Sequence, residues 1–163
     1  EMVMVEEDHA VFRLNIQPES KNSYGMVHGG AIYAMADNAT GFVYDAASGT
    51  YKMLHADGTP QLDANNSQQA GFDNLLILFS ASSLRDDGLT LDYDLSMGGG
   101  VWLNGGHLWT ITWTQGRDNT LLLYDADGRT MNIEAGTSYI ALVTSLTGQE
   151  LTVTNSSGEA ILG

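Results

Sequence analysis

The fold class of this chain is decided by the stretch Asn104-Gly-Gly-His-Leu-Trp-Thr-Ile-Thr-Trp-Thr114. Trp109, Ile111 and Trp113 alternate with threonines, and a period of two places them on one face of a β-strand. The Asn-Gly pair before the strand is typical of a tight hairpin turn. A platform that stacks sugars or peptides is one interpretation of these tryptophans, but packing in a core is favoured for large apolar rings on a strand.

Further strands with the same signals lie on both sides of this stretch. Nineteen glycines and only two prolines fit a fold with many turns. The short spacing between the strands favours antiparallel hairpins over parallel strands joined by helices, and residues 55–73 are expected to form a polar loop. The predicted strands are Leu75–Ser80, Leu89–Leu95, His107–Thr114, Thr120–Tyr124, Thr137–Val143 and Glu150–Thr154.

One segment is predicted to be helical, from Gly30 to about Val43, because it is rich in Ala and Met and apolar on most faces. The sequence therefore predicts the α+β class, with an antiparallel β-rich domain and one main helix near the N-terminus. We expect two parts packed as one domain. Residues 1–43 form the strand and helix segment, and residues 44–163 form the antiparallel β-rich region.

A glycine turn, Asn22-Ser-Tyr-Gly-Met-Val-His28-Gly-Gly30, precedes this predicted helix. Free N–H groups and the macrodipole at a helix N-terminus suit an oxygen that gains negative charge, and Asp37 is the natural second partner. Gly30 and Asp37 would share a helix face but lie roughly 10 Å apart along the axis, at about 1.5 Å per residue. A catalytic interpretation therefore requires two antiparallel copies of the helix across a dimer axis.

Residues 1–42 resemble the hotdog-fold acyl-CoA thioesterases of the phenylacetate-pathway type through this turn and helix. The resemblance implies a hotdog-like strand and helix followed by a β meander, and a cytoplasmic homodimer that hydrolyses acyl-CoA without a cofactor. Asn22 and His28 would shape the turn. Gly30 would offer the oxyanion N–H group, and Asp37 would be the nucleophile or general base.

Residues 39–153 resemble another family, the C-terminal domain of the YerB-like bacterial lipoproteins. This second resemblance implies an extracellular binding or structural domain without catalysis. The two resemblances meet near residues 38–43. Three origins of this junction are open: a natural fusion, an invented sequence, or an engineered chimera without activity. The motifs are Tyr44-Asp45…Gly49-x-Tyr51, Gly58-x-Pro60-x-x-Asp63, Asn74–Leu78, Gly98–Gly100, Asn104–His107 with Ile111-x-Trp113, Tyr124-x-Ala-Asp-Gly128 and Gly136-x-Ser-Tyr-Ile140.

The charge balance excludes several classes of partner. Six Lys and Arg stand against twenty Asp and Glu, a formal charge of −14. Nucleic acids and anionic membrane surfaces would be repelled. Coenzyme A would be repelled as well, unless Arg13, Lys21 and Lys52 gather near its phosphates. No apolar run approaches the ~20 residues of a membrane span, and the N-terminus lacks the basic region of a signal peptide.

Other motifs predict turns in place of metal or cofactor sites. With no Cys, the chain has no disulfide and no thiolate metal site. Asp125, Asp127 and Glu134 imitate part of a calcium loop, but the first ligand is missing and the flanks are predicted strands, which favours a hairpin turn. A glycine loop that binds phosphate is followed by a helix and a Lys, and Gly98–Gly100 is followed by neither. It is therefore expected to form a tight turn or bulge. Four carboxylates between Asp86 and Asp94 are interpreted as a solvated acidic edge.

Overall fold

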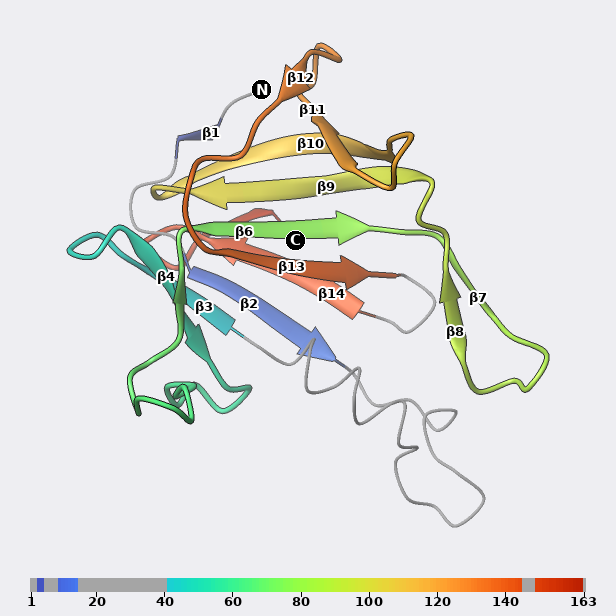
Figure 1. Ribbon diagram of the computed structural model, residues 1–163. Coiled ribbons are helices and arrows are strands. Elements are labelled where there is room, and N and C mark those ends of the chain that lie inside the picture. The colour runs from blue at the N-terminus through green and yellow to red at the C-terminus, as the bar shows by residue number, and fades with distance from the viewer. Residues whose placement is uncertain (1–2, 5–8, 15–40, 145–148, 163) are drawn as a thin grey trace.

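The computed structural model describes residues 3–4, 9–14, 41–144 and 149–162 (Figure 1). Within them the chain is all-β: two large sheets and a two-stranded arm, with no helix. The predicted α+β class is therefore wrong for the described residues. This part of the chain consequently holds no helix that could cross a membrane.

The first large sheet has seven strands among the described residues, in the order β12-β11-β10-β9-β6-β13, with β1 paired to β10. Strand β13 runs parallel to β6, and the other pairs are antiparallel. The sheet is therefore mixed, which corrects the expectation of antiparallel hairpins alone. Its strands are β1 (Val3–Met4), β6 (Asn74–Phe79), β9 (Met97–Asn104), β10 (His107–Gln115), β11 (Leu121–Tyr124), β12 (Thr130–Met131) and β13 (Ser138–Val143).

The second large sheet is antiparallel throughout the described residues, in the order β15-β14-β2-β3-β4-β5. It joins strands from both ends of the chain, because β2 pairs with β14. The arm is a separate pair formed by β7 (Ser82–Leu84) and β8 (Leu91–Tyr93). The strands of the second sheet are β2 (His9–Leu14), β3 (Gly41–Asp45), β4 (Thr50–Leu54), β5 (Gly71–Phe72), β14 (Gln149–Thr154) and β15 (Ala160–Leu162).

The C-terminal end of the predicted helix is a strand. Residues 41–43 belong to β3, which pairs with β2 on one side and β4 on the other. Residues 30–40 of the prediction lie outside the described residues. A segment that is apolar on most faces fits a buried strand as well as a buried helix, and Phe42-Val-Tyr has the aromatic and β-branched side chains that suit a sheet. Phe42 is fully buried.

The two large sheets pack face to face around one continuous core. From the second sheet, Phe42 and Tyr51 are fully buried, and from the first sheet Leu75 and Ile77 are fully buried. Burial of apolar side chains between two sheets is the main stabilising term of such a sandwich. The buried members of this core are Phe42, Tyr51, Leu75, Ile77, Val101, Leu103, Leu108, Ala141, Val143, Leu151 and Val153.

The opposite face of the first sheet carries a second apolar cluster that includes the tryptophans. Trp102 and Trp109 stack, with ring centroids 4.5 Å apart, and Trp113 is only 3% exposed. Core packing of the tryptophan face is therefore confirmed for Trp102 and Trp113, with Trp109 partly buried against them. The buried members are Leu76, Leu78, Trp102, Ile111, Trp113 and Leu123.

Gly98–Gly100 lies inside strand β9, so the expected turn or bulge is wrong. A Cβ atom at Gly98 would lie 2.0 Å from the carbonyl oxygen of Phe79 and 2.8 Å from Nε1 of Trp113, and one at Gly100 would lie 2.5 Å from the carbonyl oxygen of Ile77. The Trp113 indole donates to the Gly99 carbonyl at 2.9 Å. Glycine is needed here because strand β6 and an indole ring both approach the backbone closely.

Several hairpins share one turn design. In the Asp125–Arg129 turn, the Gly128 N–H donates to the Asp125 carbonyl and the Asp125 N–H donates to the Arg129 carbonyl. Gly128 has a φ of +76°, so a type I turn is followed by a left-handed glycine. The predicted hairpin turn at this imitation of a calcium loop is thereby confirmed, with Arg129 ion-paired to Asp127. Equivalent hydrogen bonds close the 55–59 and 155–159 turns.

Gly98→Ala is expected to lower the free energy of unfolding by about 3 kcal/mol, because the new methyl group meets backbone that cannot move without breaking the β6–β9 pairing. The control is Gly99→Ala in the same strand, where the nearest atom to a new Cβ is 4.0 Å away. That change should cost less than about 1 kcal/mol. Urea denaturation of both variants measures the difference, and equal losses would contradict this account of the glycine run.

Candidate functional site

Several of the sequence motifs meet at one end of the first sheet, where β6 begins, β9 turns into β10, and β13 begins (Figure 1). We call this region the motif corner and define it by the side chains that bond there. They are Asp73, Asn74, Trp102, Asn104 and Thr137.

The Asn74 side chain is the centre of the motif corner and is fully buried. Its Oδ1 accepts hydrogen bonds from Trp102 Nε1 and from Asn104 Nδ2, both at 3.1 Å. Its Nδ2 donates to the backbone carbonyl of Glu134 at 3.0 Å. An amide placed between apolar faces has to find such partners, since a buried polar group without them costs free energy.

The carboxylate of Asp73 fixes the start of β13. It accepts hydrogen bonds from the Thr137 backbone N–H at 2.7 Å and from the Thr137 hydroxyl at 2.9 Å. These hydrogen bonds lower the pKa of Asp73, since they stabilise the charged form. Gly136 has a φ of +143°, and a Cβ there would lie 2.5 Å from Asp73 Oδ2. The Gly136-Thr137 pair is therefore fitted to this carboxylate.

The β9–β10 turn links the motif corner to the second sheet. Gly105 and Gly106 have φ angles of +55° and +77°, and Asn104 pairs with His107 across the turn, as in a type I′ hairpin. The predicted Asn-Gly turn is confirmed. The Gly106 N–H donates to the Tyr51 hydroxyl at 3.1 Å, and a Cβ atom at Gly106 would lie only 2.9 Å from Cε1 of the Tyr44 ring.

His107 is the residue of this region that most resembles a reactive group. Its Nδ1 is buried and has no hydrogen-bond partner, and its ring lies 5.8 Å from that of Trp109. A general base needs a partner that orients it and a nucleophile within reach. The described residues contain no group of three or more His, Cys, Asp or Glu that could hold a metal ion. His107 is the first residue of β10, so its predicted place in a strand is confirmed, and its predicted role as polar filling stays a prediction.

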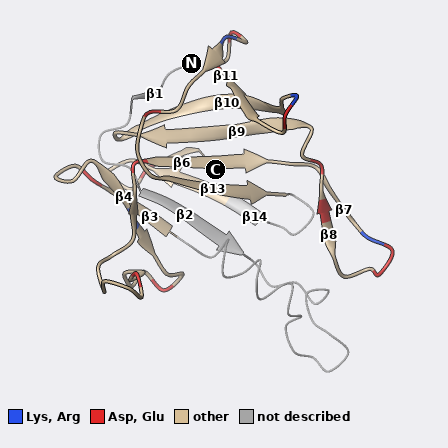
Figure 2. Ribbon diagram, in the orientation of Figure 1, with Lys and Arg blue, Asp and Glu red and all other residues tan. Residues whose placement is uncertain are grey.

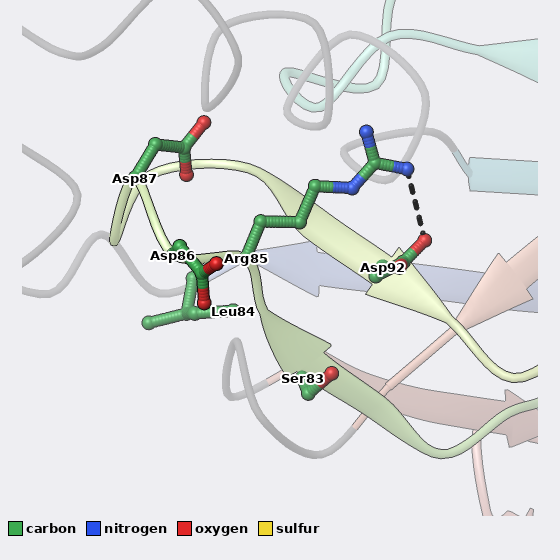
Figure 3. Close-up of a pocket in the computed structure, with 6 residues that line it drawn as sticks. All are labelled: Ser83, Leu84, Arg85, Asp86, Asp87 and Asp92. Atoms are coloured by element: carbon green, nitrogen blue, oxygen red, sulfur yellow. Dashed lines mark hydrogen bonds and ion pairs between the residues drawn. The ribbon is translucent and has the colours of Figure 1, made fainter.

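A second feature is an open hollow on the arm, with a volume of about 470 Å³. Figure 3 shows the Arg85 side chain lying along the arm toward Asp92, and the two form an ion pair at 3.0 Å. Asp87 accepts hydrogen bonds from the Thr90 hydroxyl and from the N–H groups of Thr90 and Leu89, which lower its pKa to about 2. The lining residues are Ser83, Leu84, Arg85, Asp86, Asp87 and Asp92.

The family described as "Protein of unknown function (DUF3048) C-terminal domain" matches residues 31–140. The chain belongs to this family. The crystal structure of the YerB protein from Bacillus subtilis is similar, with a TM-score of 0.65 at 17% identity. This identity shows a shared fold alone. The match covers 91% of this chain and 44% of the YerB chain, so the present domain spans less than half of that protein. A search of curated proteins gave no significant match.

These comparisons confirm the resemblance to the YerB-like C-terminal domain and contradict the hotdog thioesterase interpretation. The match to the DUF3048 C-terminal domain begins at residue 31, inside the segment assigned to the hotdog helix. No hotdog fold is evident among the described residues, where β2 and β3 are strands of one sandwich sheet.

The predicted catalytic residues Asn22, His28, Gly30 and Asp37 lie outside the described residues. The thioesterase activity from which their roles were inferred has no support in the family match or in the structural likeness. Sequence reasoning missed the motif corner of this DUF3048 domain. The available signal was a polar Asp73-Asn74 pair directly before the apolar run Leu75–Leu78, because an amide at the start of a buried strand needs partners.

Asn74→Leu is expected to destabilise the domain by about 3 kcal/mol, since the indole of Trp102 and the amide of Asn104 lose their shared acceptor in a buried site. Asn65→Ala is the control, because Asn65 is an exposed amide and should change stability by less than about 0.5 kcal/mol. Chemical denaturation followed by tryptophan fluorescence gives both values. Equal, small changes would show that the amide network contributes little.

The lowered pKa of Asp73 predicts a dependence of stability on pH. The charged form is favoured in the folded state, so the stabilisation is present above the unfolded pKa of about 3.9 and is lost as pH falls through the lower folded pKa. Asp73→Asn should therefore be less stable than the parent at pH 7, and the gap should narrow below about pH 4. Urea melts from pH 7 to pH 3 measure it, with the exposed Asp118→Asn as control; a constant gap would contradict the assignment.

Proposed function

We propose that this domain is a non-catalytic binding domain. The observation that carries the proposal is that the polar side chains of the motif corner are hydrogen-bonded to other groups of the fold. Oδ1 and Nδ2 of Asn74 and the carboxylate of Asp73 are all engaged in hydrogen bonds within the fold. Groups held in this way set the positions of strands and leave no free pair of nucleophile and base.

The arrangement of the outer surface supports binding in place of chemistry. The hollow on the arm is open, and its polar groups are partly used by the Arg85–Asp92 ion pair and the turn at Asp87. Enzyme sites are usually enclosed pockets with converging polar groups. A surface that projects from the body is suited to contact with another macromolecule.

The test is a panel of chromogenic carboxylic esters, phosphate monoesters and glycosides, together with acyl-CoA thioesters. We expect turnover no faster than with a heat-denatured sample of the same protein. The polar groups of the motif corner are engaged within the fold, and the described residues hold no group of three or more His, Cys, Asp or Glu that could bind a metal ion. The panel is repeated with His107→Ala, which removes the histidine with the unpartnered nitrogen. Turnover that scales with protein concentration and disappears in this variant would overturn the non-catalytic assignment.

A further inference from the structure

The β7–β8 arm stands apart from the two sheets. Among the described residues its strands pair only with each other, and it extends away from the ends of β6 and β13 (Figure 1). An isolated two-stranded hairpin is marginally stable in water. A hairpin that projects in this way therefore needs local supports.

The root of the arm is fixed to the body by buried polar groups. The Ser80 hydroxyl donates to the Asp94 carbonyl at 2.6 Å, and Ser80 is buried. The hydroxyls of Ser82 and Thr144 lie 2.6 Å apart in a second hydrogen bond. The direction in which the arm leaves the fold is consequently set by the body, and little conformational entropy is lost when a partner docks on it.

The tip of the arm is ordered by its own contacts. Asp87 accepts three hydrogen bonds from Leu89 and Thr90, and the Arg85–Asp92 ion pair joins the two strands. The surface that the arm presents is thus preorganised in the absence of a partner.

Apolar side chains are concentrated on the arm and at its root. Of nine large hydrophobic residues that are exposed among the described residues, five lie between residues 79 and 97. Leu84 and Leu89, near the tip, are 54% and 57% exposed. Exposed apolar side chains gathered in one segment mark contact sites, whereas single ones are ordinary. The five are Phe79, Leu84, Leu89, Leu95 and Met97.

The charges around these leucines decide the chemistry of the partner. Asp86, Asp87, Asp92 and Asp94 lie on the arm and its root with a single cation, Arg85, which is already paired with Asp92. Figure 2 shows acidic segments along the arm, and Figure 3 labels Asp86, Asp87 and Asp92 there. A neutral apolar partner would desolvate carboxylates without compensation. A second copy of this chain, with a formal charge of −14, would be repelled, as would nucleic acid or an anionic membrane.

We infer that the β7–β8 arm is a docking surface for a cationic, amphipathic segment of a partner protein. Its basic side chains face Asp86 and Asp87 at the open hollow, and its apolar side chains cover Leu84 and Leu89. Complementary charge speeds encounter and selects the partner, while the leucines supply the apolar contact. The inference rests on the proposed binding function and names the chemistry of its partner.

The probe is a short fluorescent peptide of alternating lysine and leucine, titrated into the full chain and followed by anisotropy. We expect saturable binding that weakens with added salt. A peptide of alternating glutamate and leucine should not bind, and one of alternating lysine and serine should bind about tenfold more weakly. Absence of binding by the lysine–leucine peptide, or equal binding of all three peptides, would overturn the inference.

Variants locate the binding on the arm. Leu84→Ser with Leu89→Ser should weaken binding about tenfold. Leu62→Ser is the matched control, because Leu62 is similarly exposed, at 51%, and lies outside the arm; it should leave binding unchanged. Equal weakening by Leu62→Ser would show diffuse attraction to an acidic surface and overturn the inference. Asp86→Lys is a second variant with no core contact at stake, and it should weaken binding and reduce its salt dependence.

Two further readouts separate the remaining outcomes. Thermal melts establish that each variant is folded before titration. Sedimentation of the parent is expected to show no association through the arm, and a dimer dissociated by the paired leucine variant would place a second copy there and overturn the cationic partner. Turnover in the substrate panel would refute the proposed function, whereas absence of peptide binding without turnover would refute this inference alone.

Discussion

The first sheet depends on one buried amide, the side chain of Asn74. Its Oδ1 accepts hydrogen bonds from the Trp102 indole and the Asn104 amide of β9. Its Nδ2 donates to the Glu134 carbonyl in the connection that leads to β13. It therefore holds the two neighbours of β6 at once, the antiparallel one and the parallel one. A hydrophobic residue of the same size would fill the space but remove the acceptor of the Trp102 indole and the donor to the Glu134 carbonyl. The Asn104 amide would keep only its second acceptor, the Asp73 carbonyl. These losses explain why a polar side chain stands at the start of an otherwise apolar strand.

The central strand β6 separates two kinds of surface. At its start lies the motif corner, where polar groups are bonded to one another and the Gly106 N–H reaches Tyr51 of the other sheet. At its end lies Phe79, followed by the root of the arm (Figure 1). One end of β6 is thus held by hydrogen bonds, and the other end leads into an exposed projection. This arrangement is compatible with a domain in which the sheets are a scaffold and the arm makes the contacts with a partner.

The sequence was a good guide where strands are half-buried and hairpins are local. The alternation of Trp109, Ile111 and Trp113 predicted β10, and Asn104-Gly105 predicted its turn, since these signals act within a few residues. Sequence-based predictions were wrong where contacts between distant residues determine the local structure. Gly98–Gly100 looked like a turn because the close approach of Trp113 cannot be read from neighbouring residues. Residues 41–43 are predicted to be helical because a short apolar run has no periodicity that distinguishes a helix from a strand.

The candidate site was missed for a related reason. The glycine turn and Asp37 offered a local pattern with an attractive chemistry, whereas the motif corner is assembled from residues far apart in sequence. The parallel pairing of β13 with β6 also has no local signal, because its register is set by Asp73 and Thr137. The Asn-Gly turn is the part of the motif corner that could be predicted from sequence. The hydrogen bonds that Asn74 makes across the corner could not be predicted.

The pairing of strands also determines the order in which the sheets can form as the chain is synthesised. The Asp73–Thr137 contact joins positions 64 residues apart, and β2 near the N-terminus pairs with β14 near the C-terminus. The short hairpins close loops of a few residues and so cost little entropy, while these long closures cost more. Strand β6, apolar on both faces, leaves the ribosome well before its partner β13. During that interval one edge of this apolar strand is unpaired, which favours aggregation and capture by chaperones.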